Sequence, residues 1–105
     1  IRTPRGRGKP DGALHEVTAL RLSAGVLDAL RERSGLPGDA VEDVIWGNVT
    51  QVGEQGGCLA RSAVLASSLD ESVPGLSVTR FCASGLEAVN LAANQIRAGA
   101  GEGYI

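Results

Sequence analysis

The chain has 105 residues, enough for one small domain with a modest core. Hydrophobic residues make up 43% and charged residues 21%, which excludes a wholly disordered chain and a fibrous repeat. Aromatic residues make up only 3% and the net charge is -2, so neither base stacking nor phosphate attraction favours a nucleic-acid-binding protein.

The first nine positions carry four of the ten basic residues, namely Arg2, Arg5, Arg7 and Lys9. A cationic arm can contact phosphate, but the glycines between these residues indicate a solvated loop. No apolar run approaches the roughly 18 residues that cross a bilayer, so we expect a cytoplasmic protein with no membrane contact. Cys58 and Cys82 are expected to be free thiols, and with a single histidine they form no metal site.

The first half of the chain contains two predicted helices around one predicted strand. Apolar residues recur at helical spacing from Glu16 to Arg33, and the Ser34-Gly35 pair ends the pattern. Val44 to Trp46 form an apolar run of β-forming residues, typical of a strand covered by helices on both faces. The GEQGG stretch at 53–57 breaks the chain, and an Ala-rich helix is predicted over 59–69.

The second half continues the alternation of strands and helices. Leu76 to Phe81 predict a short strand, and Gly85 to Ala98 predict a helix that is apolar nearly all round. Such a helix is typical of the interior of a larger structure. Gly103 to Ile105 is typical of a strand that is just beginning, and the chain has no methionine, so we expect a fragment of a longer protein. This order of elements indicates an α/β layered architecture.

Cys82 is the strongest candidate for chemistry, because it lies between the second predicted strand and the last predicted helix. Free N–H groups and the partial positive charge at a helix N-terminus stabilise a thiolate, and they can also face an oxyanion. The small side chains of Ala83 and Ser84, with Gly85, leave room for an acyl group. From these residues alone, a buried packing role for Cys82 stays open as the alternative.

The stretch RFCASGLEAV at 80–89 resembles the nucleophile segment of the thiolases, whose motif runs Asn-Arg-x-Cys-x-Ser-Gly-Leu-x-Ala. Further stretches resemble thiolases in the same order and at similar spacing: Arg2-Thr3-Pro4, Gly12-Ala13-Leu14, Val44 to Val49, Gln51-Val52-Gly53, Gly57, Ala60-Arg61, Ala63 and Val73-Pro74-Gly75. The resemblance covers essentially the whole chain. It implies a layered αβα fold with a mixed central sheet, of which residues 1–105 form the incomplete first part of the N-terminal domain.

The resemblance also implies an activity. Cys82 would attack the 3-oxo carbonyl of a 3-oxoacyl-CoA, acetyl-CoA would leave, and coenzyme A would take the acyl group from the enzyme. In the reverse direction two acetyl-CoA molecules would condense through an acetylated Cys82. Coenzyme A is then a substrate, no cofactor is expected, and the Cys82 N–H would be one donor of an oxyanion hole.

Two departures from the family pattern stand out. Thr79 occupies a position where thiolases usually have Asn, which alters local hydrogen bonding. The histidine and the second cysteine of the thiolase mechanism follow later in the family, beyond Ile105. His15 does not replace the histidine, because its place before an amphipathic helix indicates a surface or capping residue.

Other candidate residues receive structural interpretations. Cys58 is expected to be a small packing residue at the start of the second helix. The GEQGG stretch has no Lys-Ser/Thr pair for phosphate and is interpreted as a structural turn. Its counterpart in thiolases lies near the subunit interface, so the resemblance implies a homodimer or homotetramer. Glu87 is expected only to complement the helix dipole.

Two functions remain open from the sequence. The first is a thiolase-type acyltransferase, for which Cys82 is the catalytic candidate. The second is a thiolase-like protein that binds acyl-CoA or lipid without turnover. Cys82 favours the enzyme, and Thr79 slightly weakens it.

Overall fold

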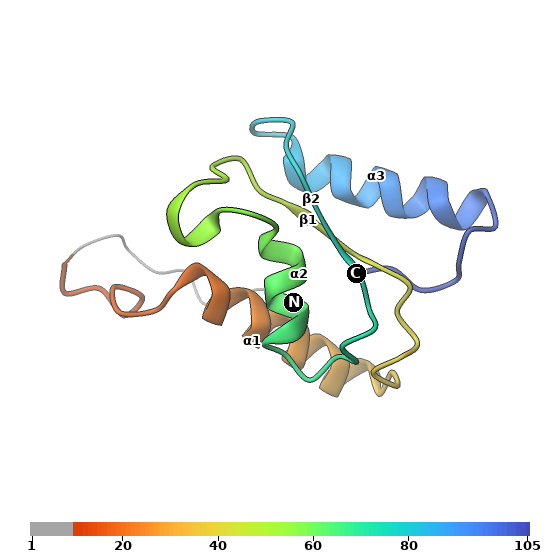
Figure 1. The fold of residues 1–105 in the computed structure, drawn as a ribbon, viewed down its shortest axis with the longest axis horizontal. Helices are drawn as coiled ribbons and strands as arrows, with labels where there is room; N and C mark the ends of the chain where they lie inside the picture. The colour runs from red at the N-terminus through yellow and green to blue at the C-terminus, as the bar shows by residue number, and fades with distance from the viewer. Residues whose placement is uncertain (1–9) are drawn as a thin grey trace.

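The computed structural model describes residues 10–105, in which a short parallel sheet lies between helices (Figure 1). The four basic residues of the predicted arm and the Arg2-Thr3-Pro4 stretch lie outside the described residues. Strand β1 spans Val44–Gly47 and strand β2 spans Gly75–Val78, and they pair in parallel with Val44 opposite Gly75. The α/β alternation predicted from the sequence is confirmed.

Helix α1 spans Ala19–Ser34, so it begins three residues later than the periodicity predicts. Thr18 sets the start, because its hydroxyl accepts a hydrogen bond from the Arg21 N–H at 3.1 Å and caps the helix. Gly35 ends the helix in the left-handed conformation at a φ of 67°, as the sequence predicts.

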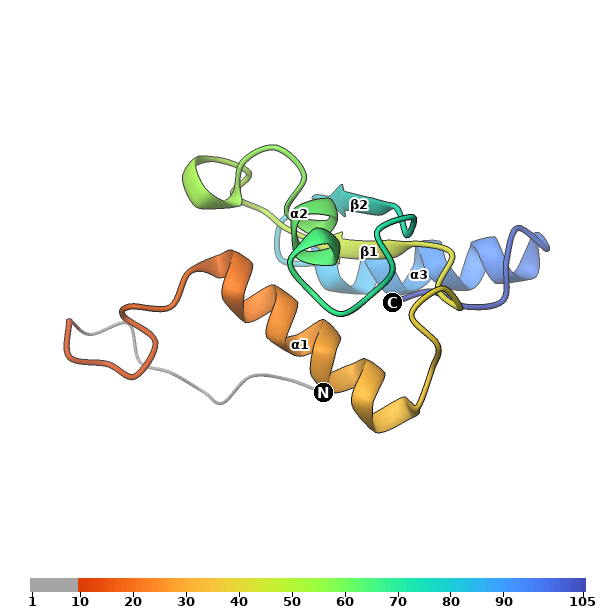
Figure 2. The same ribbon diagram turned by 60° about the horizontal axis from the view of Figure 1, so that its bottom comes forward.

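Helix α2 spans Leu59–Leu65 and covers one face of the sheet (Figure 2). The sequence predicts a helix to residue 69, but the Ser67 hydroxyl donates to the Val64 carbonyl at 2.9 Å and accepts from the Leu69 N–H at 3.2 Å. This local bridge replaces the next helical turn. Leu69 is still buried, at 7% exposed, so its apolar signal in the sequence reflects the core rather than the helix.

Helix α3 spans Ser84–Arg97 and lies against the opposite face of the sheet from α2. Two glycines in the strands allow α2 and α3 to lie close to the sheet. An ideal Cβ on Gly47 would lie 2.6 Å from the Ser84 carbonyl carbon, and one on Gly75 would lie 2.7 Å from the Ala60 carbonyl carbon. Gly75 is paired with Val44, so these two residues face the same side of the sheet. Gly47 lies three residues after Val44 and therefore faces the other side. The two helices therefore enclose the sheet, as predicted for a strand with continuous apolar residues.

The core lies between α1, α2 and the sheet. Leu27, Val44 and Val64 are its largest fully buried side chains. The surrounding buried cluster consists of Val41, Ala60, Ala63, Leu69 and Val73. Because these side chains are mostly small, the elements approach one another closely, which agrees with the Gly-rich and Ala-rich composition.

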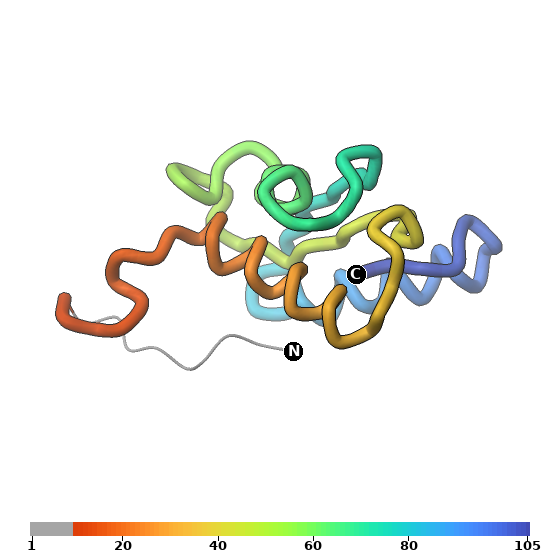
Figure 3. Tube along the Cα trace, turned by 90° about the horizontal axis from the view of Figure 1, so that it is seen from below, coloured from red at the N-terminus to blue at the C-terminus, as the bar shows by residue number. Residues whose placement is uncertain are grey.

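The last residues of the chain return beside β1 (Figure 3). Tyr104 pairs in parallel with Asp43, and the Ile45 N–H donates to the Ile105 carbonyl at 2.7 Å. A strand start at 103–105 is thus confirmed, on the edge of β1 away from β2. All the strand pairings within residues 10–105 are parallel, and the antiparallel part expected of a mixed sheet stays a prediction.

Candidate functional site

The segment that carries Cys82 is a tight loop between β2 and α3. The predicted strand runs to Phe81, whereas β2 ends at Val78 because the chain turns at Arg80. The Ala83 N–H donates to the Arg80 carbonyl at 3.0 Å, and the Ser84 N–H donates to the Phe81 carbonyl at 3.0 Å. We call residues 80–84 the nucleophile loop.

Phe81 has a φ of 48°, the left-handed region that bulky residues rarely adopt. Ser84 holds this conformation from the first turn of α3. Its hydroxyl donates to the Phe81 carbonyl at 2.6 Å and accepts from the Arg80 N–H at 2.9 Å. Ser84 is only 4% exposed, so water competes little for these bonds.

Cys82 is exposed and lies two residues before α3 begins. Within residues 10–105 Cys82 is therefore not packed in the core. Within residues 10–105 its backbone N–H makes no hydrogen bond. The positive end of α3 lies beside the same position, which favours an oxyanion there.

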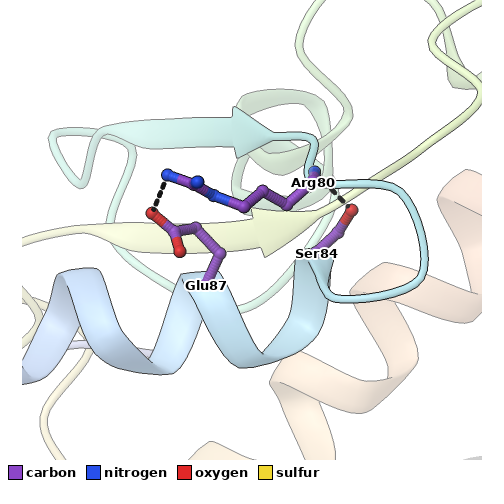
Figure 4. Close-up of polar contacts among 3 residues, drawn as sticks. All are labelled: Arg80, Ser84 and Glu87. Carbon is purple, nitrogen blue, oxygen red and sulfur yellow. Dashed lines mark hydrogen bonds and ion pairs between the residues drawn. The ribbon is translucent and has the colours of Figure 1, made fainter.

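An ion pair also joins the nucleophile loop to α3 (Figure 4). The Arg80 guanidinium lies 3.0 Å from the Glu87 carboxylate, and the Glu87 side chain is 24% exposed. Sequence reasoning missed this pair, because it treated Glu87 only as a partner of the helix dipole. A basic residue seven positions before an acidic one, across a strand-to-helix turn, is the signal that could have found it.

A surface hollow of about 500 Å³ opens beside this loop. Thr79, Arg80 and Glu87 supply its polar lining, and Val78, Phe81 and Leu91 complete it. Thr79 is exposed, so the family departure at this position lies on the surface next to the nucleophile loop. The Cys82 side chain is not part of the lining.

The 53–57 stretch is a structural turn, as predicted. Its first three residues form a short 3-10 helix, Gly53–Gln55. The buried Asn48 amide donates to the Gln55 carbonyl at 3.2 Å, and the Glu54 carboxylate accepts from the Ala19 N–H at 2.8 Å. The turn is thus tied to the end of β1 and to the start of α1.

Cys58 and Cys82 are both free thiols, as expected, but their surroundings differ. Cys58 is half-buried against the core, and its Sγ lies 3.3 Å from the Gly75 carbonyl and 3.6 Å from the Ser77 hydroxyl. Burial raises the pKa of the Cys58 thiol, but hydrogen bonds from the Arg61 backbone and from Ser77 outweigh it, so the pKa lies below its usual value. Its packing role is confirmed.

His15 is a surface residue, which is one of the two roles predicted for it, and it does not cap α1. Its side chain is 53% exposed and lies 3.5 Å from the Glu16 carboxylate, while Thr18 caps the helix. In the part of the chain from residue 10 onward, no group of three His, Cys, Asp or Glu side chains could hold a metal ion. None of the helices in that same part is long and apolar enough to cross a membrane.

Comparison with known proteins identifies the family. The family described as "Thiolase, N-terminal domain" matches residues 1–105. The chain belongs to the thiolase family. The 3-ketoacyl-CoA thiolase of Colwellia psychrerythraea is 41% identical over 106 aligned residues, which are 100% of this chain and 27% of that protein. The 3-ketoacyl-CoA thiolase of Cronobacter sakazakii is 42% identical over 94% of this chain and 26% of its own length.

A solved structure supports the same family. The acetyl-CoA acetyltransferase of Bacillus anthracis superposes with a TM-score of 0.79 and 35% sequence identity, over 89% of this chain and 24% of that one. The thiolase-like α/β fold expected from the resemblance is confirmed. This thiolase chain spans about a quarter of the length of the relatives it matches.

Proposed function

We propose that this thiolase segment carries the nucleophile of an acyltransferase, and that the nucleophile is Cys82. One observation carries the proposal. Cys82 is an exposed thiol that follows the left-handed Phe81 just before α3, and its backbone N–H makes no hydrogen bond within residues 10–105. Strained backbone of this kind is concentrated at functional sites. A thiol is both a strong nucleophile and a good leaving group, which suits transfer through a covalent intermediate.

The substrates we propose are 3-oxoacyl-CoA and coenzyme A. The Cys82 sulfur bonds to the 3-oxo carbon, the bond between the second and third acyl carbons breaks, and the leaving carbon takes a proton to give acetyl-CoA. The coenzyme A thiol then attacks the acyl-cysteine and restores Cys82. The printed names of the relatives, 3-ketoacyl-CoA thiolase and acetyl-CoA acetyltransferase, support this substrate class. The same steps in reverse condense two acetyl-CoA molecules.

Cys82 works in this scheme with groups outside residues 1–105. The family resemblance places a histidine and a second cysteine later in the chain, and these would supply the base and move the protons. We therefore propose that residues 1–105 are the first part of a thiolase N-terminal domain and are inactive alone. The cytoplasm is the proposed location, supported by the two free thiols, which suit a reducing compartment.

A homodimer or homotetramer is the proposed assembly, with residues 51–57 at the contact. Val52 on this turn is 68% exposed and nearby Val49 is 48% exposed. Exposed apolar side chains on a turn that is itself held rigidly suit an interface between subunits.

The test is Cys82→Ser in the full-length protein. Serine preserves the size of the side chain, so the fold and acyl-CoA binding should survive. Its hydroxyl has a far higher pKa than a thiol and leaves poorly from an ester, so thiolytic turnover should fall by several orders of magnitude. Rate and acyl-CoA affinity are measured on the same preparation. Near-parental turnover in this variant would contradict the mechanism and favour a protein that only binds acyl-CoA or lipid.

A further inference from the structure

Two groups on the first turn of α3 hold a single residue of the nucleophile loop. The Ser84 hydroxyl accepts from the Arg80 backbone N–H at 2.9 Å, and the Glu87 carboxylate binds the Arg80 guanidinium at 3.0 Å (Figure 4). Arg80 is thus fixed through both its main chain and its side chain. Cys82 lies midway between Arg80 and Ser84, so the two ends of its loop are closed on each other.

This loop needs such a closure because Phe81 is in the left-handed region, with a φ of 48°. A conformation of this kind persists only when surrounding contacts hold it. The Phe81 side chain is 80% exposed and gives little packing support. The Phe81 carbonyl instead accepts two hydrogen bonds from Ser84, from its N–H at 3.0 Å and from its hydroxyl at 2.6 Å.

The ion pair contributes to the shape of the loop more than to global stability. The Arg80 side chain is 66% exposed and the Glu87 side chain 24% exposed. Exposed ion pairs add little to the stability of a fold. However, this pair joins the start of the loop to the helix that follows it, so its loss would free the loop while leaving the core intact.

We propose that Ser84 and Glu87 are positioning residues for Cys82, and that both act by holding Arg80. The nucleophile loop then keeps the Cys82 sulfur and backbone N–H in one orientation toward the acyl group. This inference rests on the proposed function, since it takes Cys82 as the nucleophile. It goes beyond that function because it assigns positioning roles to Ser84 and Glu87.

The experiment compares Ser84→Ala, Glu87→Gln, Arg80→Gln and the double variant Arg80→Gln/Glu87→Gln in the full-length protein. The readouts are kcat, KM, the melting temperature, and the iodoacetamide alkylation rates of Cys82 and Cys58 in the same molecule. Each single change should slow Cys82 alkylation and kcat by about tenfold to a hundredfold, because small misplacements of a nucleophile are costly. KM and Cys58 alkylation should stay near the parental values.

The double variant tests whether Glu87 acts through Arg80. Two residues in one interaction give non-additive effects, so the double variant should be no slower than the slower single variant. Arg80→Lys keeps the positive charge and should recover most of the rate that Arg80→Gln loses. Additive losses, or no recovery with lysine, would overturn the role assigned to the pair.

Two control variants separate this role from general structural damage. Ser67→Ala removes a hydroxyl bridge of the same kind at the end of α2, where Ser67 donates to the Val64 carbonyl at 2.9 Å. Glu16→Gln removes the carboxylate of the His15 pair, at 3.5 Å. Both should leave Cys82 alkylation unchanged, and a loss equal to that of Ser84→Ala or Glu87→Gln would overturn the proposal.

The outcomes also distinguish this proposal from the proposed function. If Cys82→Ser keeps its turnover, the nucleophile assignment fails, and this proposal fails with it. If Cys82→Ser is inactive while Glu87→Gln alkylates and turns over like the parent, the function stands and the positioning role fails. Ser84 is buried, so if Ser84→Ala does not fold, the variants of the exposed Arg80 and the partly buried Glu87 decide the question.

Discussion

Gly47 and Ser84 are in backbone contact, although 36 intervening residues separate them in the chain. An ideal Cβ on Gly47 would lie 2.6 Å from the Ser84 carbonyl carbon and 2.7 Å from the Gly85 nitrogen. Real Cβ atoms do not approach backbone this closely, so only glycine fits at the end of β1. Because Ser84 closes the nucleophile loop, the last residue of β1 determines where Cys82 lies.

Gly47→Ala should therefore destabilise the full-length protein by about 1–3 kcal/mol, the usual effect of adding a methyl group to a filled space. The displaced start of α3 should also slow Cys82 alkylation. The measurements are denaturant unfolding and the alkylation rate. Gly25→Ala is the matched control, because no atom lies within 4 Å of its Cβ and alanine favours a helix. If Gly47→Ala and Gly25→Ala have the same effect on stability and on alkylation, the close approach of Gly47 to Ser84 does not matter.

Cys82 should react with iodoacetamide well before Cys58 in the full-length protein at neutral pH. Cys82 is exposed, whereas Cys58 is half-buried against the core. The lowered pKa of the Cys58 thiol works against this order, but limited access should dominate. Mass spectrometry of the labelled peptides measures the two rates. In denaturant the difference should disappear, and equal or reversed labelling in the folded protein would contradict the nucleophile assignment.

The pairing of 103–105 with β1 should weaken in acid. The pKa of the Glu42 carboxyl lies below its usual range, because it accepts backbone hydrogen bonds from Gly103 first and from Glu102 next. Its folded-state pKa is depressed, so the stabilisation is complete above the unfolded pKa of about 4.3 and is lost as the pH falls through the folded pKa. Amide exchange at Gly103, corrected for intrinsic rates, should show this loss of protection. Glu42→Gln should remove the pH dependence of this protection. If the dependence is unchanged in that variant, another group causes it.

Residues 1–105 produced alone should self-associate through α3. Leu86, Val89 and Ile96 lie on one side of the helix and are 65%, 64% and 48% exposed. Such a face is unfavourable in water, which agrees with the sequence-based expectation of a helix that belongs inside a larger structure. Light scattering should show aggregates and calorimetry a non-cooperative melt.

Val89→Lys should reduce that association, whereas Leu36→Lys should not. Leu36 is 43% exposed but lies beyond the end of α1, so the control adds the same charge elsewhere. A sharp two-state transition in a monomer of residues 1–105 would show that the segment is stable without a partner for α3.

The sequence by itself predicted the elements that depend on local periodicity. Helical spacing and the Gly35 stop located α1, and the apolar run at Val44 and Ile45 identified a strand that is buried on both faces. The family motif identified Cys82 between a strand and a helix. These features can be predicted from the sequence because buried apolar residues recur along it at the period of the helix or strand that they form.

Only the tertiary structure decided how the site is held together. The left-handed Phe81, the Ser84 bridge and the Arg80–Glu87 pair depend on the chain turning back on itself, and strand propensity had extended β2 through Phe81. The requirement for glycine at position 47 arises from a helix that begins 37 residues later. Such contacts form between segments that are distant in the sequence, so no local period encodes them. The fold is therefore visible in the spacing of apolar residues, whereas the orientation of Cys82 depends on packing between β1 and α3.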